Sequence, residues 1–209
     1  MSSPRRSASV WVGAVGVVGA TAIGVLFAVN RSSSPAVPTT PPPAVNAAAL
    51  TGLQQGPPPW PAEIARLRAR LGVLGLPVLA REGTKLHTHQ HLDVFVDGSR
   101  VSVPAGIGIN VAEHFISPIH THDASGVIHV ESPTVRSFSV AELFGVWGVR
   151  LTKNCLGGRC RAGGLRVFVN GRQVADPNRA LLGRHDEIVV AFGPPPKPLP
   201  SSYSFPSGF

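Results

Sequence analysis

The stretch HTHQHLDVFVDG, residues 87–98, decides how the central part of this chain folds. Its Asp97-Gly98 pair is a frequent two-residue hairpin turn, and the valines and phenylalanine before it favour a strand. The second strand of this hairpin is expected at residues 100–103. Side chains alternate across a strand, so one face of the first strand is apolar and is the natural core face. That face carries Leu92, Val94 and Val96.

The opposite face of the same strand carries His87, His89 and His91, followed by Asp93. Imidazole is the commonest protein ligand for zinc and copper. An exposed strand edge needs no row of histidines, because threonine, lysine or glutamate would serve equally well. The motif therefore predicts a metal site, in which Asp93 is a candidate to accept an imidazole N–H and orient the ring.

A second histidine cluster lies further along the chain, at His120, His122 and His129. If the turn-rich residues 123–126 form a hairpin loop, His122 pairs with Val127 and His120 lies directly opposite His129. Their Cβ atoms are then about 4.5–5.5 Å apart, which allows both rings to bind one ion. Glu131 shares the face of His129, so Asp123 and Glu131 are candidate orienting groups or catalytic bases for a metal-bound water. Hydrogen-bonded structural histidines are the alternative.

Together the two clusters offer more ligands than one tetrahedral ion needs. One site can draw on both, two sites can exist, or some histidines only support the ligands. The favoured ligands are His89, His91, His120 and His122, with His87 and His129 next. Such a set suits copper or zinc as the cofactor. His114 and His185 are expected to be ordinary surface residues.

The N-terminal part of the chain predicts a membrane anchor. Residues 10–29 form an uncharged apolar run long enough to span a bilayer, after Arg5 and Arg6 in residues 1–9. The arginines place residues 1–9 in the cytoplasm and the remainder of the chain outside. A cleaved signal peptide is the alternative, although its apolar stretch is usually shorter. The expected location is the cell membrane, with a single-pass helix and an extracytoplasmic domain.

Two other segments are rich in proline. Residues 30–60 are expected to be an extended linker, and residues 194–209 a disordered tail, because neither composition builds a core. Residues 61–193 between them are expected to form a histidine-rich α+β domain dominated by antiparallel hairpins, with one or two short helices. The positive charge of +8 is scattered without a basic run, so no nucleic-acid partner is expected.

Local signals place the elements of this domain. A helix is expected to open at Pro61, and the capping-box pattern of residues 139–142 opens a second. Residues 167–177 repeat the pattern V-F-V-[D/N]-G-x-x-V-x-x-P and predict another hairpin, and residues 188–192 predict a final strand. Outside the cytoplasm, Cys155 and Cys160 are expected to form a disulfide, with thiolate ligation or a redox pair as the alternative.

Residues 87–149 resemble a bacterial family of secreted or membrane-anchored histidine-rich domains. The resemblance rests on the strings HTHQHLDVFVDG, VPAGIGI, HTHDASGVIHVES and FSVAELFGVWGV. It implies a domain boundary and attaches no activity to the chain.

Three functions remain open from the sequence. The favoured one is a membrane-anchored metal-binding protein that handles copper or zinc outside the cytoplasm. The second is a metal-dependent hydrolase or oxidase with a histidine-ligated metal, in which Glu131 or Asp123 takes part in catalysis. The third is an accessory or structural subunit of a membrane complex, with a protein partner in the cell envelope.

Overall fold

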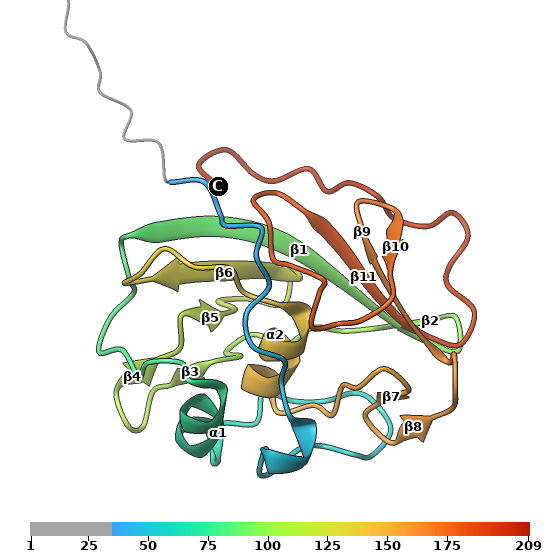
Figure 1. Ribbon diagram of the computed structural model, residues 1–209, viewed down its shortest axis with the longest axis horizontal. Coiled ribbons are helices and arrows are strands. Elements are labelled where there is room, and N and C mark those ends of the chain that lie inside the picture. The colour runs from blue at the N-terminus through green and yellow to red at the C-terminus, as the bar shows by residue number, and fades with distance from the viewer. Residues whose placement is uncertain (1–34) are drawn as a thin grey trace, which may run out of the picture. The chain divides into compact units, whose positions relative to one another are not determined.

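The computed structural model describes residues 35–209 (Figure 1). The predicted anchor at residues 10–29 and the segment before it lie outside the described residues. Among residues 35–209, no helix has both the length and the apolar character needed to cross a bilayer.

The described residues form a mixed α+β fold that is mostly β, with two short α-helices. A seven-stranded sheet has the order β10-β9-β11-β1-β6-β5, and β2 pairs with β1 beside this path. Its strands are β1 (Leu86–Val96), β2 (Ser99–Val101), β5 (Ile119–His120), β6 (Val127–Ser132), β9 (Leu165–Val169), β10 (Arg172–Val174) and β11 (Glu187–Phe192). All pairings in it are antiparallel except that of β1 with β11, so the predicted dominance of antiparallel strands is confirmed.

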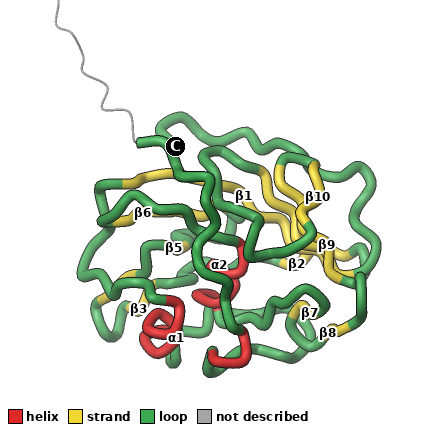
Figure 2. Tube along the Cα trace, in the orientation of Figure 1, coloured by secondary structure: helices red, strands yellow, loops and turns green. Residues whose placement is uncertain are grey.

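The remaining elements are short. Two small ribbons and three helices complete the described chain, and loops make up much of the rest (Figure 2). They are β3 (Ile109–Asn110) with β4 (Phe115–Ile116), β7 (Cys155–Leu156) with β8 (Arg159–Cys160), the 3-10 helix η1 (Ala47–Ala49), α1 (Leu67–Leu74) and α2 (Val140–Trp147). A disulfide joins Cys155 to Cys160 across the second ribbon, as predicted, so neither sulfur is available as a thiolate ligand.

Both predicted hairpins are confirmed. Asp97 and Gly98 have φ angles of 51° and 82° and connect β1 to β2. Asn170 and Gly171 have φ angles of 50° and 75° and connect β9 to β10. Positive φ at both central residues is the type I′ geometry that matches the strand twist, and Asp-Gly and Asn-Gly adopt it at little cost.

Helix α2 is the centre of the main core. The predicted capping box is present: Ser139 Oγ accepts a hydrogen bond from the Glu142 N–H at 3.2 Å, and the Glu142 carboxylate accepts one from the Ser139 N–H at 2.8 Å. Every residue of α2 is buried. The helix packs in one hydrophobic cluster with the apolar face of β1, which carries Leu92 and Val94 as expected. Helix α2 therefore covers the apolar face of the sheet.

Helix α1 begins later than the sequence indicates. It starts at Leu67 rather than near Pro61, and Ile64 is 41% exposed. Its N-cap Arg66 makes no side-chain capping bond, and the Glu63 carboxylate accepts a hydrogen bond from the Arg66 N–H at 3.2 Å. Buried Arg70 connects α1 to α2, because its guanidinium donates to the carbonyl of Gly145 at 2.8 Å.

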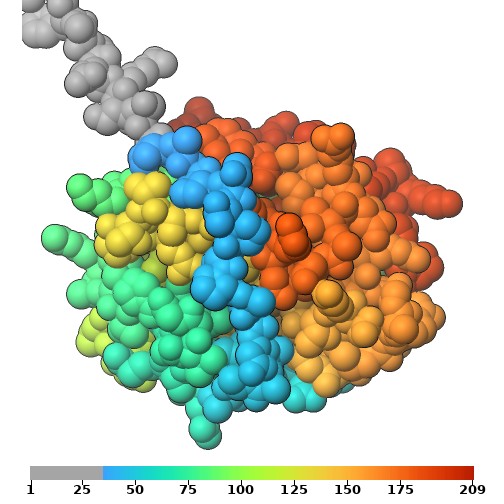
Figure 3. Space-filling model, viewed as in Figure 1, coloured from blue at the N-terminus to red at the C-terminus, as the bar shows by residue number. Residues whose placement is uncertain are grey.

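The segments on either side of the domain pack against it. Residues 35–60, expected as a spacer, run over the domain surface (blue in Figure 3) and end at Trp60, which is buried edge-on against Trp147. Residues 194–209, expected as a disordered tail, lie along the histidine-bearing face of the sheet. Leu199 packs there on a small apolar cluster that includes Phe95 and Phe168. Apolar side chains between the prolines therefore pack on the domain, which the composition of these segments does not predict.

Candidate metal centre

The pairing of three neighbouring strands brings the two histidine clusters together. His89 on β1 is paired with His129 on β6, and His129 is in turn paired with His120 on β5. The expected opposition of His120 and His129 is therefore confirmed. In the next row, His87 is paired with Glu131. Paired residues project from the same face, so the sheet itself aligns these side chains.

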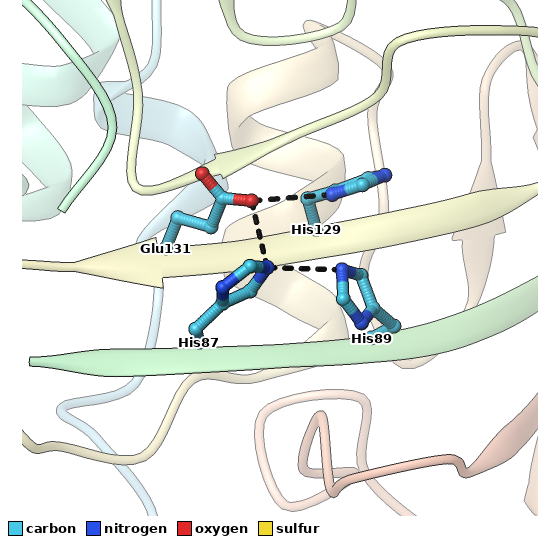
Figure 4. A group of neighbouring side chains, drawn as sticks. All are labelled: His87, His89, His129 and Glu131. Atoms are coloured by element: carbon cyan, nitrogen blue, oxygen red, sulfur yellow. Dashed lines mark hydrogen bonds and ion pairs between the residues drawn. The ribbon is translucent and has the colours of Figure 1, made fainter. Parts of the chain in front are cut away.

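The first group of possible metal ligands joins β1 to β6 (Figure 4). It consists of His87, His89, His129 and Glu131, whose ligand atoms all lie within 4.8 Å of one another. His87 Nε2 lies 3.1 Å from His89 Nε2 and 3.1 Å from Glu131 Oε1. His129 Nδ1 lies 3.3 Å from the same carboxylate oxygen. Figure 4 shows these three contacts as dashed lines.

The second group joins β5 and the following loop to β6. It consists of His120, His122, His129 and Glu131, again with ligand atoms within 4.8 Å of one another. The Nε2 atoms of His120 and His122 are 3.2 Å apart, and His120 Nε2 is 4.0 Å from Glu131 Oε2. His120 Nδ1 donates to the Ser117 carbonyl at 3.0 Å, which directs the Nε2 lone pair toward the group.

His91 lies apart from both groups. Its Nδ1 donates to the buried carboxylate of Glu187 at 2.7 Å, and with Asp93 these residues form a third, buried group. Asp93 is also paired with Arg100. The favoured ligand set of His89, His91, His120 and His122 is thus not brought together as one group among the described residues.

Asp123 and the two remaining histidines lie outside all three groups. The Asp123 carboxylate accepts a hydrogen bond from the Ser125 N–H at 2.9 Å and shapes the turn. The hydrogen bonds from Ser125 lower the pKa of Asp123. His114 and His185 are exposed, each in a turn with positive φ, so they are surface residues as expected.

The electrostatic environment keeps the central imidazoles neutral. Burial, followed by the neighbouring His129 and His87, lowers the pKa of His89 to about 4. Burial is also the main cause that lowers the pKa of His120 to about 4, against the opposing effect of Glu131. Metal binding requires deprotonated ligands. Near neutral pH these rings therefore present lone pairs without first losing a proton.

Glu131 is the charged residue at the middle of the centre. Burial raises its pKa, but the hydrogen bond from His129 and the nearby His120 and His87 outweigh this effect and hold the pKa well below its usual value. The side chain is nevertheless only 6% exposed. A buried carboxylate is a strong cation ligand, because a cation recovers the solvation that burial removes.

Two carboxylates near the centre, those of Glu82 and Glu187, were not predicted from the sequence. Glu82 Oε1, from the loop before β1, lies 3.4 Å from His122 Nε2. Glu187 reaches His91 through the parallel pairing of β11 with β1, at a sequence separation of 96. Glu82 is an isolated acidic residue in a loop and carries no signal. The only sequence feature that could have indicated a buried role for Glu187 is its position as a charged residue at the start of an apolar strand.

Three of the six ligand separations in the first group are close to those of a tetrahedral ion. Zinc–nitrogen bonds of about 2.0–2.1 Å put neighbouring ligands about 3.3–3.4 Å apart. The measured separations are 3.1, 3.1 and 3.3 Å. In addition, His89 Nδ1 is buried without a hydrogen-bond partner. This nitrogen is not the one that faces His87, which is Nε2, so a partner of Nδ1 would stabilise the domain separately from an ion bound at Nε2.

The comparisons assign the chain to no family. No family model matches it, and neither a curated protein nor a solved structure is significantly similar to it.

Proposed function

We propose that this domain binds a divalent transition metal through the histidine centre and handles copper or zinc at the outer face of a membrane. One observation carries the proposal: imidazoles from three strands surround the single carboxylate of Glu131. His87 on β1 and His129 on β6 lie 3.1 and 3.3 Å from its Oε1, and His120 on β5 lies 4.0 Å from its Oε2. The predicted anchor at residues 10–29 supports the location.

Zinc and Cu(II) differ in the ligand spacing that they prefer. A square-planar Cu(II) ion with bonds of about 2.0 Å puts adjacent ligands about 2.8–2.9 Å apart, closer than a tetrahedral ion does. The separations of 3.1, 3.2 and 3.3 Å in the centre fall between these two geometries and select neither metal. Copper remains the competing metal, because its intrinsic affinity for imidazole is higher.

Elemental analysis of the purified full chain, after loading with zinc or copper and dialysis, tests the proposal. We expect stoichiometric metal in the wild type and a loss of metal in the variants His89→Ala and His120→Ala. His114→Asn is the matched control, because His114 is exposed and asparagine tolerates its positive φ of 53°. Circular dichroism confirms that each variant folds. A wild type that retains no metal under any loading condition would refute the proposal.

A metal-dependent hydrolase is the second candidate, and a neighbouring cleft supports it. A cleft of about 620 Å³ lies beside the centre, lined by Arg81, Glu82 and Lys85 among others. Its Glu82 also contacts His122. Two cationic side chains there suit an anionic substrate such as a phosphate ester.

Hydrolysis assays separate these functions. We expect metal handling to show no metal-dependent turnover of nitrophenyl phosphate or nitrophenyl acetate. Zinc-dependent turnover that falls in Glu82→Gln would establish the hydrolase instead. Metal that is held inertly, without turnover and without release to a competing chelator, would favour the accessory subunit with a protein partner in the envelope.

A further inference from the structure

The two oxygens of Glu131 face different histidines. Oε1 lies 3.1 Å from His87 Nε2 and 3.3 Å from His129 Nδ1. Oε2 lies on the side of His120, 4.0 Å from its Nε2. A carboxylate with separate partners on its two oxygens is the arrangement that bridges two cations, because each oxygen can ligate one of them.

A single ion cannot take all these ligands. Two ligands bound to one ion at about 2.0–2.1 Å are separated by at most about 4.2 Å. The ligand atoms of the centre fall into two groups, each with all separations within 4.8 Å, and the groups share only His129 and Glu131. His87 and His89 thus belong to one position, and His120 and His122 to another.

The first position is complete. Three imidazoles, from His87, His89 and His129, and Glu131 Oε1 supply four donors, which is the full set of a closed tetrahedral zinc site. The side chains of His129 and Glu131 are 13% and 6% exposed, whereas that of His87 is 51% exposed, so the position is closed by its four donors and not by burial.

The second position is incomplete. His120, His122 and Glu131 Oε2 supply three donors, and the fourth place faces His122, whose side chain is 44% exposed. Glu82 lies at this place, 3.4 Å from His122 Nε2, with its side chain 49% exposed. Three protein ligands with an exchangeable fourth are typical of zinc sites that bind substrate or release metal.

Charge indicates that this fourth place takes an anion. Two divalent cations bring four positive charges into a centre whose buried carboxylate, Glu131, supplies one negative charge. The excess charge is costly where water is scarce. The Glu82 carboxylate, a hydroxide or a substrate anion at the second ion reduces this excess.

We propose that the centre holds two metal ions bridged by Glu131, a closed position at His87, His89 and His129 and an open position at His120 and His122. This inference rests on the proposed function and adds its stoichiometry and asymmetry. The closed ion holds β1 and β6 together, whereas the open ion is the one that exchanges, so cargo or substrate is bound there.

A matched pair of variants tests the two positions in the full chain. His87 and His122 have side chains 51% and 44% exposed, so His87→Ala and His122→Ala leave the core intact. Zinc titration by calorimetry should give two ions per chain in the wild type. Each variant should lose at least about 10-fold in affinity at one position while the other is unchanged. His114→Asn is again the control.

Electron paramagnetic resonance of the Cu(II)-loaded chain tests the bridge. Two ions about 3.5–4 Å apart couple magnetically. The resonance signal of the wild type should therefore account for much less copper than elemental analysis finds. Glu131→Gln should either restore the full signal or cause the loss of one of the two bound ions.

The outcomes separate the two proposals. One ion per chain, lost in both His87→Ala and His122→Ala, would overturn the two-ion centre and leave the metal-binding function standing. Two uncoupled Cu(II) ions in the wild type would overturn the bridge. No bound metal in the wild type would end both proposals.

Discussion

Tyr203 lies flat on His91, with ring centroids 3.8 Å apart and ring planes within 3° of parallel. Beneath this stack, His91 donates to Glu187, whose other carboxylate oxygen is buried without a partner. His91 is thus held between the segment at residues 194–209 and the sheet. Although it belongs to the densest histidine motif of the sequence, its contacts are those of a structural residue.

Replacement of His91 should therefore affect stability rather than metal binding. In His91→Ala, the zinc stoichiometry should equal that of the wild type. The free energy of unfolding should fall by about 1–3 kcal/mol, because the buried Glu187 carboxylate loses its donor. Urea unfolding and elemental analysis measure the two effects. A variant that loses metal but keeps its stability would place His91 among the ligands instead.

The segment at residues 194–209 should limit access to the centre. The ring of Phe209 lies 4.6 Å from that of His89 and 5.8 Å from that of His129, between centroids. In Phe209→Ala, the zinc ion held by His87, His89 and His129 should transfer to a competing chelator several-fold faster, because the apolar cover over these rings is removed. Phe205→Ala is the control, since Phe205 stacks on His185 outside the centre. Equal transfer rates in both variants would show that Phe209 does not control access.

The metal-free protein should lose stability as the pH falls. The pKa values of His89 and His120 are lowered from 6.5 to about 4, so between these values the unfolded state binds more protons than the folded state. The stability that the neutral rings provide is complete above pH 6.5 and is lost toward pH 4. One pKa unit corresponds to about 1.4 kcal/mol, so a lowering from 6.5 to about 4 corresponds to a loss on the order of 3 kcal/mol for each ring.

Urea unfolding across this pH window measures the effect. The double variant His89→Gln/His120→Gln should show a much shallower dependence, because glutamine does not titrate. The lowered pKa of Glu131 contributes separately below its ordinary value of 4.5, where protonation removes the stability of its ionised form. A wild-type stability that is constant from pH 6.5 to pH 4 would contradict the buried neutral state.

Two arginines on one helix should differ sharply in their effect on stability. Arg70 is fully buried, pairs with Glu63 and donates to carbonyls at the end of α2. Arg70→Ala should cost about 3 kcal/mol, because it leaves these acceptors buried without a donor. Arg68 has a side chain 55% exposed, and Arg68→Ala should cost less than about 1 kcal/mol. Thermal unfolding that ranks the two variants equally would refute this assignment.

Local interactions explain what the sequence by itself determined. The hairpin turns at Asp97-Gly98 and Asn170-Gly171 and the capping box at Ser139 depend on residues within a few positions of one another. Strand alternation, likewise local, put the histidines of β1 on the face opposite its apolar core face. The turn residues between His122 and Val127 likewise predicted that His120 lies opposite His129 on the neighbouring strand.

Only the tertiary structure decided which histidines meet and which carboxylate they share. That choice depends on the register between strands, which pairs His87 with Glu131 and draws His91 toward Glu187 on a distant parallel strand. It depends also on a loop that carries Glu82 to His122. Register and loop placement arise from the packing of the whole core, because a shift of one residue would turn every side chain of a strand to the other face. The histidine motifs therefore predict metal chemistry, whereas the folded sheet selects the ligands.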